Sequence, residues 1–98
     1  MTIAHTKNGN ALTVALEGRL DTMTAPELET FLKDALADVE ELTVDLAKLD
    51  YISSAGLRVL LATQKAVQGR DGMVIRNITD EVREIFEVTG FMDILTVE

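Results

Sequence analysis

Cysteine and tryptophan are absent from this sequence, and histidine occurs only once among its 98 residues. Without cysteine there is neither a disulfide framework nor a thiolate metal site, and a small secreted scaffold usually carries one of the two. The single histidine, His5, has no cysteine with which to hold a metal ion. We therefore expect a cytoplasmic protein that carries no metal and no other cofactor.

Long apolar runs and basic charge are also scarce. The N-terminus lacks the basic and then apolar pattern of a signal peptide, and no apolar run approaches the roughly 18 residues that a membrane span needs. Nine basic residues stand against 17 acidic ones, which gives a net charge of -8. Such a charge repels phosphate backbones and anionic lipid surfaces. We expect a soluble protein that binds neither nucleic acid nor a membrane, so that another protein is the partner class left open.

The usual motifs of catalysis and nucleotide binding are missing as well. A Ser-His-Asp triad would need His5 to meet Ser53 or Ser54 across the fold, and neither serine sits in the G-x-S-x-G turn that presents a nucleophile. Neither of the glycine-rich phosphate loops, G-x-G-x-x-G or G-x-x-x-x-G-K-[ST], occurs. The sequence therefore predicts a binding protein and not an enzyme.

What the chain does have is enough apolar sequence for one core. Apolar residues make up 47% of the composition. A chain of this length buries about 60 to 65% of the surface that it exposes when unfolded, which suits one compact unit. We expect a single domain over residues 1–98.

The N-terminal half predicts a hairpin followed by a helix. Thr2 to Thr6 is predicted as an edge strand, Asn8-Gly9 as a hairpin turn, and the alternating segment Ala11 to Glu17 as the second strand. A helix is predicted to start at Thr24, where Glu27 completes a capping box and Pro26 occupies the first turn. Its buried face follows the i, i+3, i+4 spacing of Leu28, Phe31, Leu32, Ala35, Leu36 and Val39.

The C-terminal half predicts alternating strands and helices. Leu42 to Leu46 is predicted as a central strand, Ala47 to Tyr51 as a turn, Ser54 to Gly69 as a helix, and Met73 to Ile75 as an interior strand. A third helix is predicted between a cap at Thr79 and a stop at Gly90, with Val82, Ile85 and Phe86 inward, and Ile94 to Val97 as a last strand. The resulting order, β-β-α-β-α-β-α-β, predicts an α/β fold with a mixed, mostly parallel sheet.

Two adjacent serines mark the junction between a strand and a helix. In the segment Leu46 to Leu61, LAKLDYISSAGLRVLL, an apolar strand runs through a polar turn directly into the helix. Either serine can be the N-cap, which accepts a hydrogen bond from a first-turn N–H and contributes about 1 kcal/mol. Capping accounts for one of the serines and leaves the other without a structural reason.

Two segments resemble the motifs of a known family. DYISSAGLRVLL resembles the helix-two motif of STAS domains in anti-sigma factor antagonists, and GRLDTMTAPEL, from Gly18 to Leu28, resembles the second signature of that family. The serine two residues before the motif glycine is phosphorylated in the family, which implies phosphorylation at Ser54, with Ser53 as the alternative. The resemblance further implies partner contacts at Asp21, Thr22, Ser53, Ala55, Gly56 and Arg58.

The same resemblance implies a mechanism. The unphosphorylated chain would bind an anti-sigma factor that is also a serine kinase and thereby release the sigma factor, and a serine phosphatase would reverse the phosphorylation. ATP and magnesium would belong to the kinase. The alternative is a constitutive STAS accessory or scaffold subunit of a transport ATPase or a stress-signalling complex, in which the two serines only cap the helix.

Overall fold

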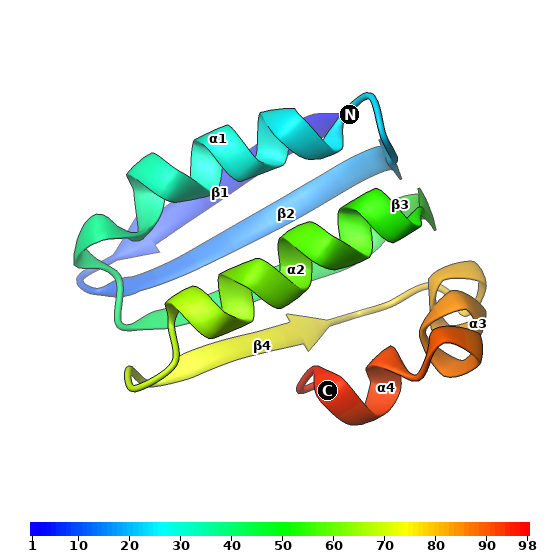
Figure 1. Ribbon diagram of the computed structural model, residues 1–98. Coiled ribbons are helices and arrows are strands. Elements are labelled where there is room, and N and C mark those ends of the chain that lie inside the picture. Colours follow the sequence, from blue (N-terminus) through cyan, green and yellow to red (C-terminus); the bar gives the residue numbers. More distant parts are fainter.

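A four-stranded mixed sheet with helices packed on one face organises the structure, a computed structural model that describes all of residues 1–98 (Figure 1). The strands lie in the order β1-β2-β3-β4; β1 and β2 are antiparallel, and β2, β3 and β4 are parallel. The elements are β1 (Thr2–Asn8), β2 (Ala11–Leu20), α1 (Ala25–Ala35), a 3-10 turn (Leu36–Asp38), β3 (Glu41–Ile52), α2 (Ser54–Ala66), β4 (Gly72–Arg76), α3 (Asp80–Thr89) and α4 (Phe91–Ile94). The predicted α/β class is confirmed.

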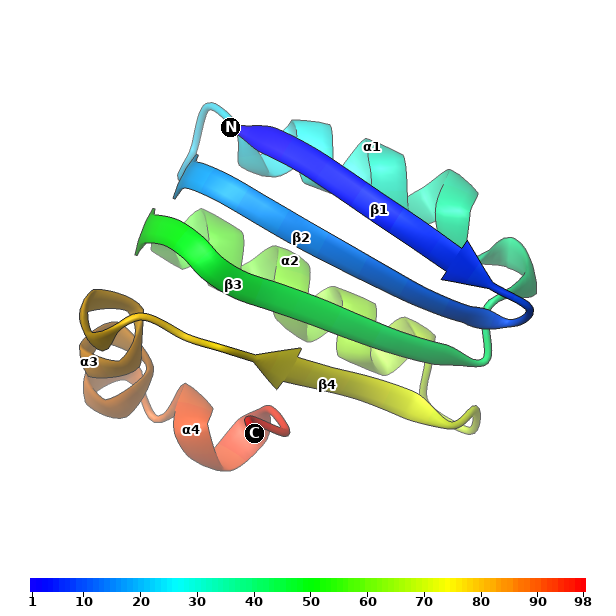
Figure 2. The ribbon, with the colours of Figure 1, turned by 180° about the vertical axis from the view of Figure 1, so that it is seen from behind.

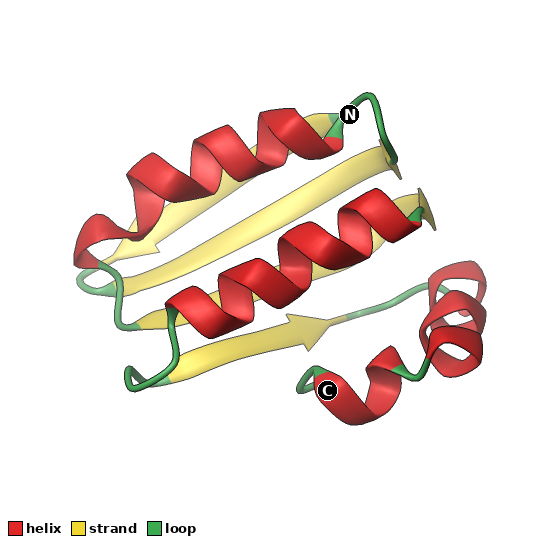
Figure 3. Ribbon diagram, viewed as in Figure 1, coloured by secondary structure: helices red, strands yellow, loops and turns green.

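The core lies between the sheet and the two long helices. Helices α1 and α2 run side by side over the same face of the sheet, and the reverse view shows its other face without a covering helix (Figures 2 and 3). Alternation along the strands explains this arrangement, because every second residue points to the helices. The inward residues of β2 and β3 are buried: Leu12, Val14, Leu16, Leu42, Val44 and Leu46.

The predicted hairpin and the second helix start where the sequence indicated. Asn8 pairs with Ala11 across a turn in which Gly9 has a φ of +64°, a conformation that glycine adopts without strain. Helix α2 begins at Ser54 as expected, but it ends at Ala66 and not at Gly69. None of the helices is both long and apolar enough to cross a membrane.

The predicted capping box at the start of α1 is wrong. Thr24 is the N-cap residue, and Pro26 lies in the first turn as expected, but the Thr24 side chain makes no capping hydrogen bond to the helix. Its hydroxyl instead donates to the carbonyl of Arg19 and accepts from the N–H of Asp21, each at 2.9 Å. The hydroxyl is therefore used to close the turn between β2 and α1.

The predicted turn from Ala47 to Tyr51 is also wrong, because β3 continues through it to Ile52. The register between β2 and β3 shifts twice, so that β3 holds one extra residue at each irregularity. Each bulge shifts the phase of the strand. Consequently Leu46, Leu49 and Ile52 all point into the core although they are three residues apart.

The end of the chain agrees with the prediction only up to Gly90. The Thr79 hydroxyl caps α3 by accepting from Val82 N at 3.3 Å, and Gly90 ends the helix with a φ of +82°. The predicted last strand is wrong: Phe91–Ile94 forms α4, and one isolated bridge, between Ile75 and Val97, extends the sheet. Strand β4 is consequently an edge strand of the four-stranded sheet and not an interior one.

Candidate functional site

The ends of β2 and β3 bring the two motif segments together. Leu20 pairs with Ile52 in the parallel register, and the N–H of Ser53 donates to the carbonyl of Leu20 at 2.9 Å. The loop that follows β2 and the start of α2 therefore emerge at the same edge of the sheet (Figure 1). Two segments that lie about thirty positions apart in the sequence thus form one local surface.

Gly56 allows the start of α2 to approach the two strands closely. It is buried, and a Cβ atom at this position would lie 2.7 Å from Cγ of Leu20 and 2.9 Å from Cγ1 of Ile52. Carbon atoms in contact normally stand about 3.5 to 4.0 Å apart, so no larger residue fits without movement. The motif glycine therefore fixes the height of the helix above the sheet, and with it the position of both serines.

The two serines differ in what their hydroxyls can reach. Ser53 has the extended backbone of an N-cap residue (φ -99°, ψ 176°), but its side chain makes no capping bond, and its Oγ is buried without any hydrogen-bond partner. Ser54 is the first residue of α2, and it is exposed. Ser54 is therefore accessible on the folded protein, whereas the Ser53 hydroxyl is not.

The start of α2 consequently lacks a side-chain cap. The first backbone N–H that donates within the helix is that of Leu57, to the carbonyl of Ser53 at 2.9 Å. The N–H groups of Ser54, Ala55 and Gly56 have no acceptor in the protein, as expected for an uncapped first turn. Unpaired N–H groups and the helix dipole together favour a negative charge at this place.

Asp21 organises the loop on the other side of the site. Its Oδ1 accepts hydrogen bonds from the N–H groups of Met23 and Thr24 at 3.0 and 3.1 Å. Partial desolvation raises the pKa of the carboxyl, but the hydrogen bonds from Thr24 and Met23, and Arg19 at 3.7 Å, outweigh it and lower the pKa below its ordinary value. The carboxylate is thus charged and is fixed in the loop by the N–H groups of Met23 and Thr24. No hydrogen bond or ion pair joins it to Ser54.

Arg19 and Tyr51 connect the ends of the two strands. The guanidinium carbon of Arg19 lies 4.4 Å from the centre of the Tyr51 ring, within the range of a cation–π contact. Because Arg19 also pairs with Asp21, the loop after β2 is tied to the residue that precedes Ile52. Both residues lie in the two motif segments, but the sequence predicted them outside the strands and therefore gave no signal for this contact.

Three of the expected partner-binding residues line one hollow. Thr22, Ala55 and Arg58 lie around a space of about 580 Å³ between the starts of α1 and α2, and Thr22 and Arg58 are exposed. Arg58 stands one helical turn after Ser54 and makes no hydrogen bond or ion pair in the protein. The structure thus places all the expected residues at one end of the sheet, and their contacts with a partner stay predictions.

The loop after β2 also holds an apolar residue that the sequence analysis missed. Met23 is 86% exposed, between Asp21 and Thr24, whose hydrogen bonds fix the turn. Single exposed apolar side chains are common on protein surfaces, so what distinguishes Met23 is its place in the ordered turn beside Asp21. A methionine within an otherwise polar turn was the signal available from the sequence.

The remaining candidate, His5, takes part in a packing contact. Its ring lies 4.9 Å from the ring of Phe31 on α1, centre to centre. His5 sits on β1, where it pairs with Val14 in the middle of β2, whereas the serines follow the far end of β3. No group of three or more His, Cys, Asp or Glu residues is arranged to hold a metal ion.

Comparison with known proteins places these features in one family. Residues 3–96 match the family described as Mlab, STAS domain. BtrV of Bordetella bronchiseptica, which is assigned as an anti-sigma factor antagonist, is 37% identical over 99% of this chain and 85% of its own length. The anti-sigma-B factor antagonist of Staphylococcus aureus is 34% identical over 86% of this chain and 80% of its own.

Solved structures agree with these relatives. An anti-sigma factor antagonist from Mycobacterium paratuberculosis superimposes with a TM-score of 0.88 at 25% identity, over 98% of this chain and 83% of that one. SpoIIAA, an anti-sigma factor antagonist, shares the fold at 16% identity in its unphosphorylated form, with a TM-score of 0.84 over 99% of this chain and 88% of that one. Its phosphorylated form gives a TM-score of 0.75 at 15% identity, over 99% of this chain and 91% of that one. The chain therefore belongs to the STAS domain family, among the anti-sigma factor antagonists.

Proposed function

We propose that this protein is a phosphorylation-controlled anti-sigma factor antagonist. In its unphosphorylated form it binds an anti-sigma factor that is also a serine kinase, and the sigma factor is released. The kinase then transfers the γ-phosphoryl group of ATP to Oγ of Ser54, the hydroxyl proton leaves to solvent or a base of the kinase, and ADP is formed. A serine phosphatase hydrolyses the phosphoester and restores the binding form.

The observation that carries this proposal is the contrast between the two serines. Ser54 is exposed at the first position of α2, while the Ser53 hydroxyl is buried and the N-cap position makes no capping bond. Neither hydroxyl therefore has the capping role that would explain its presence structurally. An accessible serine beside the ordered Asp21 loop supports a site of modification.

The physical effect of the phosphate follows from its surroundings. A phosphoserine carries a charge of about -1.5 to -2 at pH 7. The unpaired N–H groups of the first turn attract this charge, and Arg58, at i+4 on the same face of α2, is placed to pair with it. The fold is thus expected to survive phosphorylation.

A partner docked on the same surface meets a different situation. The phosphate adds bulk and charge between the Asp21 loop and Arg58, so a surface that packed closely against Ser54 loses its fit. If that surface used Arg58, the intramolecular pair with the phosphate removes the contact. Like-charge or unpaired groups at a contact surface cost several kcal/mol, which is sufficient for a switch.

The relatives support the identity of the partner class. The proteins from Bordetella bronchiseptica and Staphylococcus aureus are described as antagonists of anti-sigma factors, and the solved forms of SpoIIAA include a phosphorylated one. By analogy we infer an anti-sigma factor as the partner of this chain and reversible phosphorylation as its control.

A constitutive accessory or scaffold subunit is the competing function. In that case Ser53 and Ser54 would be retained as helix caps, but no capping bond from either side chain is present. The competing function also gives no reason for an exposed Ser54. The structure therefore favours the switch over the scaffold.

Site mapping tests the proposal. The cognate kinase and ATP are incubated with the wild type, Ser54→Ala and Ser53→Ala, and the product is located by peptide mass spectrometry. We expect one phosphate on Ser54 in the wild type, none on Ser54→Ala and one on Ser53→Ala. Phosphate found on Ser53, or transfer that continues in Ser54→Ala, would contradict the assignment.

A further inference from the structure

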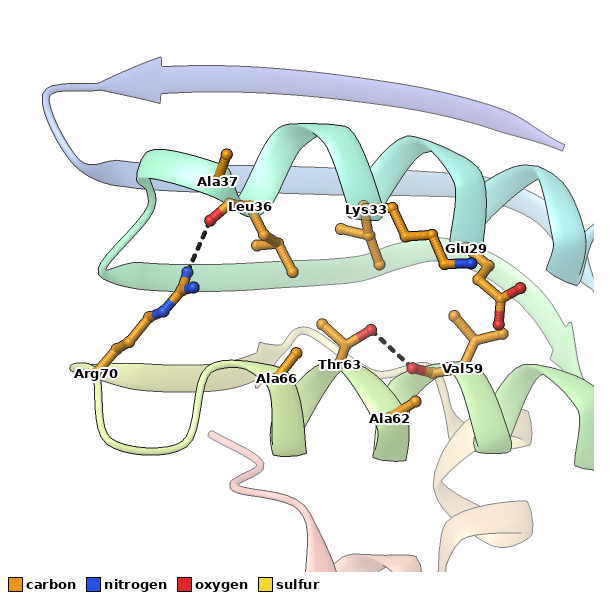
Figure 4. Close-up of a pocket in the computed structure, with 10 residues that line it drawn as sticks. Glu29, Lys33, Leu36, Ala37, Val59, Ala62, Thr63, Ala66 and Arg70 are labelled. Atoms are coloured by element: carbon orange, nitrogen blue, oxygen red, sulfur yellow. Dashed lines mark hydrogen bonds between the residues drawn. The ribbon is translucent and has the colours of Figure 1, made fainter.

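A long groove runs between α1 and α2, away from the serines. The hollow near Thr22 and Arg58 shares Glu29, Val59 and Ala62 with a second hollow of about 340 Å³, which continues along the helices to Arg70. Figure 4 shows this second hollow with the side chains of α1 and α2 on its two sides. The two hollows together follow most of the length of both helices.

The floor of the groove is apolar. Leu32, Leu36 and Val59 are buried at its base, and small alanine side chains leave the space open along α2, at Ala62 and Ala66. The one buried polar side chain is that of Thr63, and its hydroxyl donates a hydrogen bond to the carbonyl of Val59 at 2.7 Å (Figure 4). The floor therefore offers dispersion and burial to an apolar ligand and no free hydrogen-bonding group.

The far end of the groove is closed by Arg70. Its guanidinium donates to the carbonyls of Leu36 and Val39, each at 2.7 Å, at the two ends of the 3-10 turn after α1; Figure 4 shows the bond to Leu36. These bonds tie the segment after α2 to the segment after α1. The spacing between the two helices is thus fixed before any ligand binds, which reduces the cost of ordering on binding.

The rim of the groove has the opposite charge to the rest of the protein. Its lining holds four cations, Lys33, Arg58, Lys65 and Arg70, and one carboxylate, Glu29, for a local charge of +4 - 1 = +3. The whole chain carries -8, so the remainder carries -8 - 3 = -11. Lys33, Arg58 and Lys65 are exposed and make no ion pair within the chain. A cationic rim on a strongly acidic protein selects an acidic partner.

We propose that this groove is a docking site for an acidic amphipathic helix of a protein partner. The occupant places apolar side chains at i, i+3 or i+4, and i+7 on the floor and carboxylates against Lys33, Arg58 and Lys65. Helices α1 and α2, of 11 and 13 residues, span about 16 and 20 Å, which matches three to four turns of a docked helix. A second copy of this chain is disfavoured because both copies carry -8.

The proposal does not rest on the modification of Ser54, because the middle of the groove lies on Lys33, Ala62 and Lys65 and not on the serines. The proposal therefore stands even if the partner at the Ser54 end differs from the one in the groove. It also gives a route by which a phosphate on Ser54 acts on the groove, through Arg58 at its near end.

A synthetic probe tests the proposal. The probe is a fluorescent peptide of about 14 residues, four helical turns, with leucines on one face and glutamates on the flanks. The matched control peptide has the same leucines and lysines on the flanks. Fluorescence anisotropy should show saturable binding of the acidic peptide, at least about tenfold tighter than that of the basic one, and weaker at high salt. Absence of saturable binding by the acidic peptide overturns the proposal.

Charge-reversed variants locate the binding. Lys33→Glu/Lys65→Glu should weaken the acidic peptide about tenfold. Lys48→Glu/Arg83→Glu changes the net charge equally, from -8 to -8 - 4 = -12, but outside the groove, and should have a small effect. Equal losses in both variants would show that net charge alone governs binding and would overturn the assigned site.

Filling the groove provides the second test. Ala62→Phe places a ring over the shared part of both hollows, at an exposed helix position where the fold tolerates it. Binding of the acidic peptide should be lost while the thermal unfolding transition is kept. Sedimentation of the wild type distinguishes another occupant: a dimer that Ala62→Phe dissociates would identify a second copy in the groove and overturn the proposed partner class.

Discussion

Replacement of Gly56 by alanine tests how the site is positioned. The added Cβ would lie 2.7 Å from Cγ of Leu20, 3.0 Å from its Cδ2, and 2.9 Å from Cγ1 of Ile52. Leu20 is 0% and Ile52 1% exposed, so neither side chain has free space into which to move. Overpacking of this kind costs about 1 to 3 kcal/mol. The better helix propensity of alanine returns at most about 1 kcal/mol, and less in the first turn.

We therefore expect Gly56→Ala to lower the free energy of unfolding by about 1 to 2 kcal/mol. For a domain of this size that corresponds to a fall of about 4 to 16 °C in Tm. Urea unfolding followed by circular dichroism gives the first quantity and a thermal scan the second. A variant as stable as the wild type, or more stable, would refute the close approach of α2 to the strands.

A double-mutant cycle separates the steric clash from other effects of the substitution. Leu20→Ala removes the Cγ and Cδ2 atoms that the new Cβ would meet. The single variant is destabilised by about 2 to 5 kcal/mol, because a buried leucine is truncated. In that background Gly56→Ala should cost distinctly less than in the wild type, which gives a favourable coupling energy between the two sites.

Three further predictions concern single side chains of the site. Ser53→Ala should leave the free energy of unfolding unchanged or raise it by up to about 1 kcal/mol, because it removes a buried hydroxyl without a partner. A loss of about 0.5 to 2 kcal/mol, the value of an N-cap bond, would mean that this hydroxyl caps α2 in solution. Asp21→Asn should make the free energy of unfolding fall less steeply at acid pH. The lowered pKa of Asp21 stabilises the fold above the unfolded pKa of about 3.9, and this contribution disappears as pH falls through the folded pKa. Equal slopes of unfolding free energy against pH in the two proteins, from about pH 5 downward, would contradict the role of the carboxylate. In the phosphorylated protein Arg58→Leu should move the second ionisation of the phosphate to higher pH in a ³¹P NMR titration, and an unmoved titration would show that Arg58 does not pair with it.

The parts of the fold that alternation or caps specify could be predicted from the sequence. Leu12, Val14 and Leu16 alternate along β2 without interruption. Helix α3 begins at the capping hydroxyl of Thr79 and ends at Gly90, which has a left-handed backbone conformation. The order of elements up to α3 follows from these signals. The sheet edge shared by the two motif segments follows in turn, because parallel neighbouring strands end on the same side.

Two errors arose where tertiary contacts override a local pattern. The polar residues Lys48 and Asp50 interrupt the apolar alternation and favour a turn. Two bulges in β3 instead keep Leu49 and Ile52 inward, and no periodicity rule anticipates a bulge. At the C-terminus the apolar residues fit a short helix as well as a strand. Leu95 N bonds to the carbonyl of Phe91 at 2.9 Å, which closes the helical turn.

The sequence predicted that the candidate residues lie at one junction, but it did not predict their hydrogen bonds. The capping box and the N-cap at the serines were inferred from residue type. Thr24 instead uses its hydroxyl for Arg19 and Asp21, and the Ser53 hydroxyl is buried without a partner. A hydroxyl chooses among several nearby acceptors, and only coordinates reveal the choice. The uncapped start of α2 is the result that matters for function.

The central claim is that a phosphate on Ser54 switches off partner binding while the fold stays intact. The most direct measurement is the affinity for the cognate anti-sigma kinase, by isothermal titration calorimetry, of the unphosphorylated protein and of the protein phosphorylated at Ser54, with circular dichroism on both. We expect similar spectra and an affinity at least about tenfold lower for the phosphorylated form. Equal affinities of two folded forms would contradict the proposed switch.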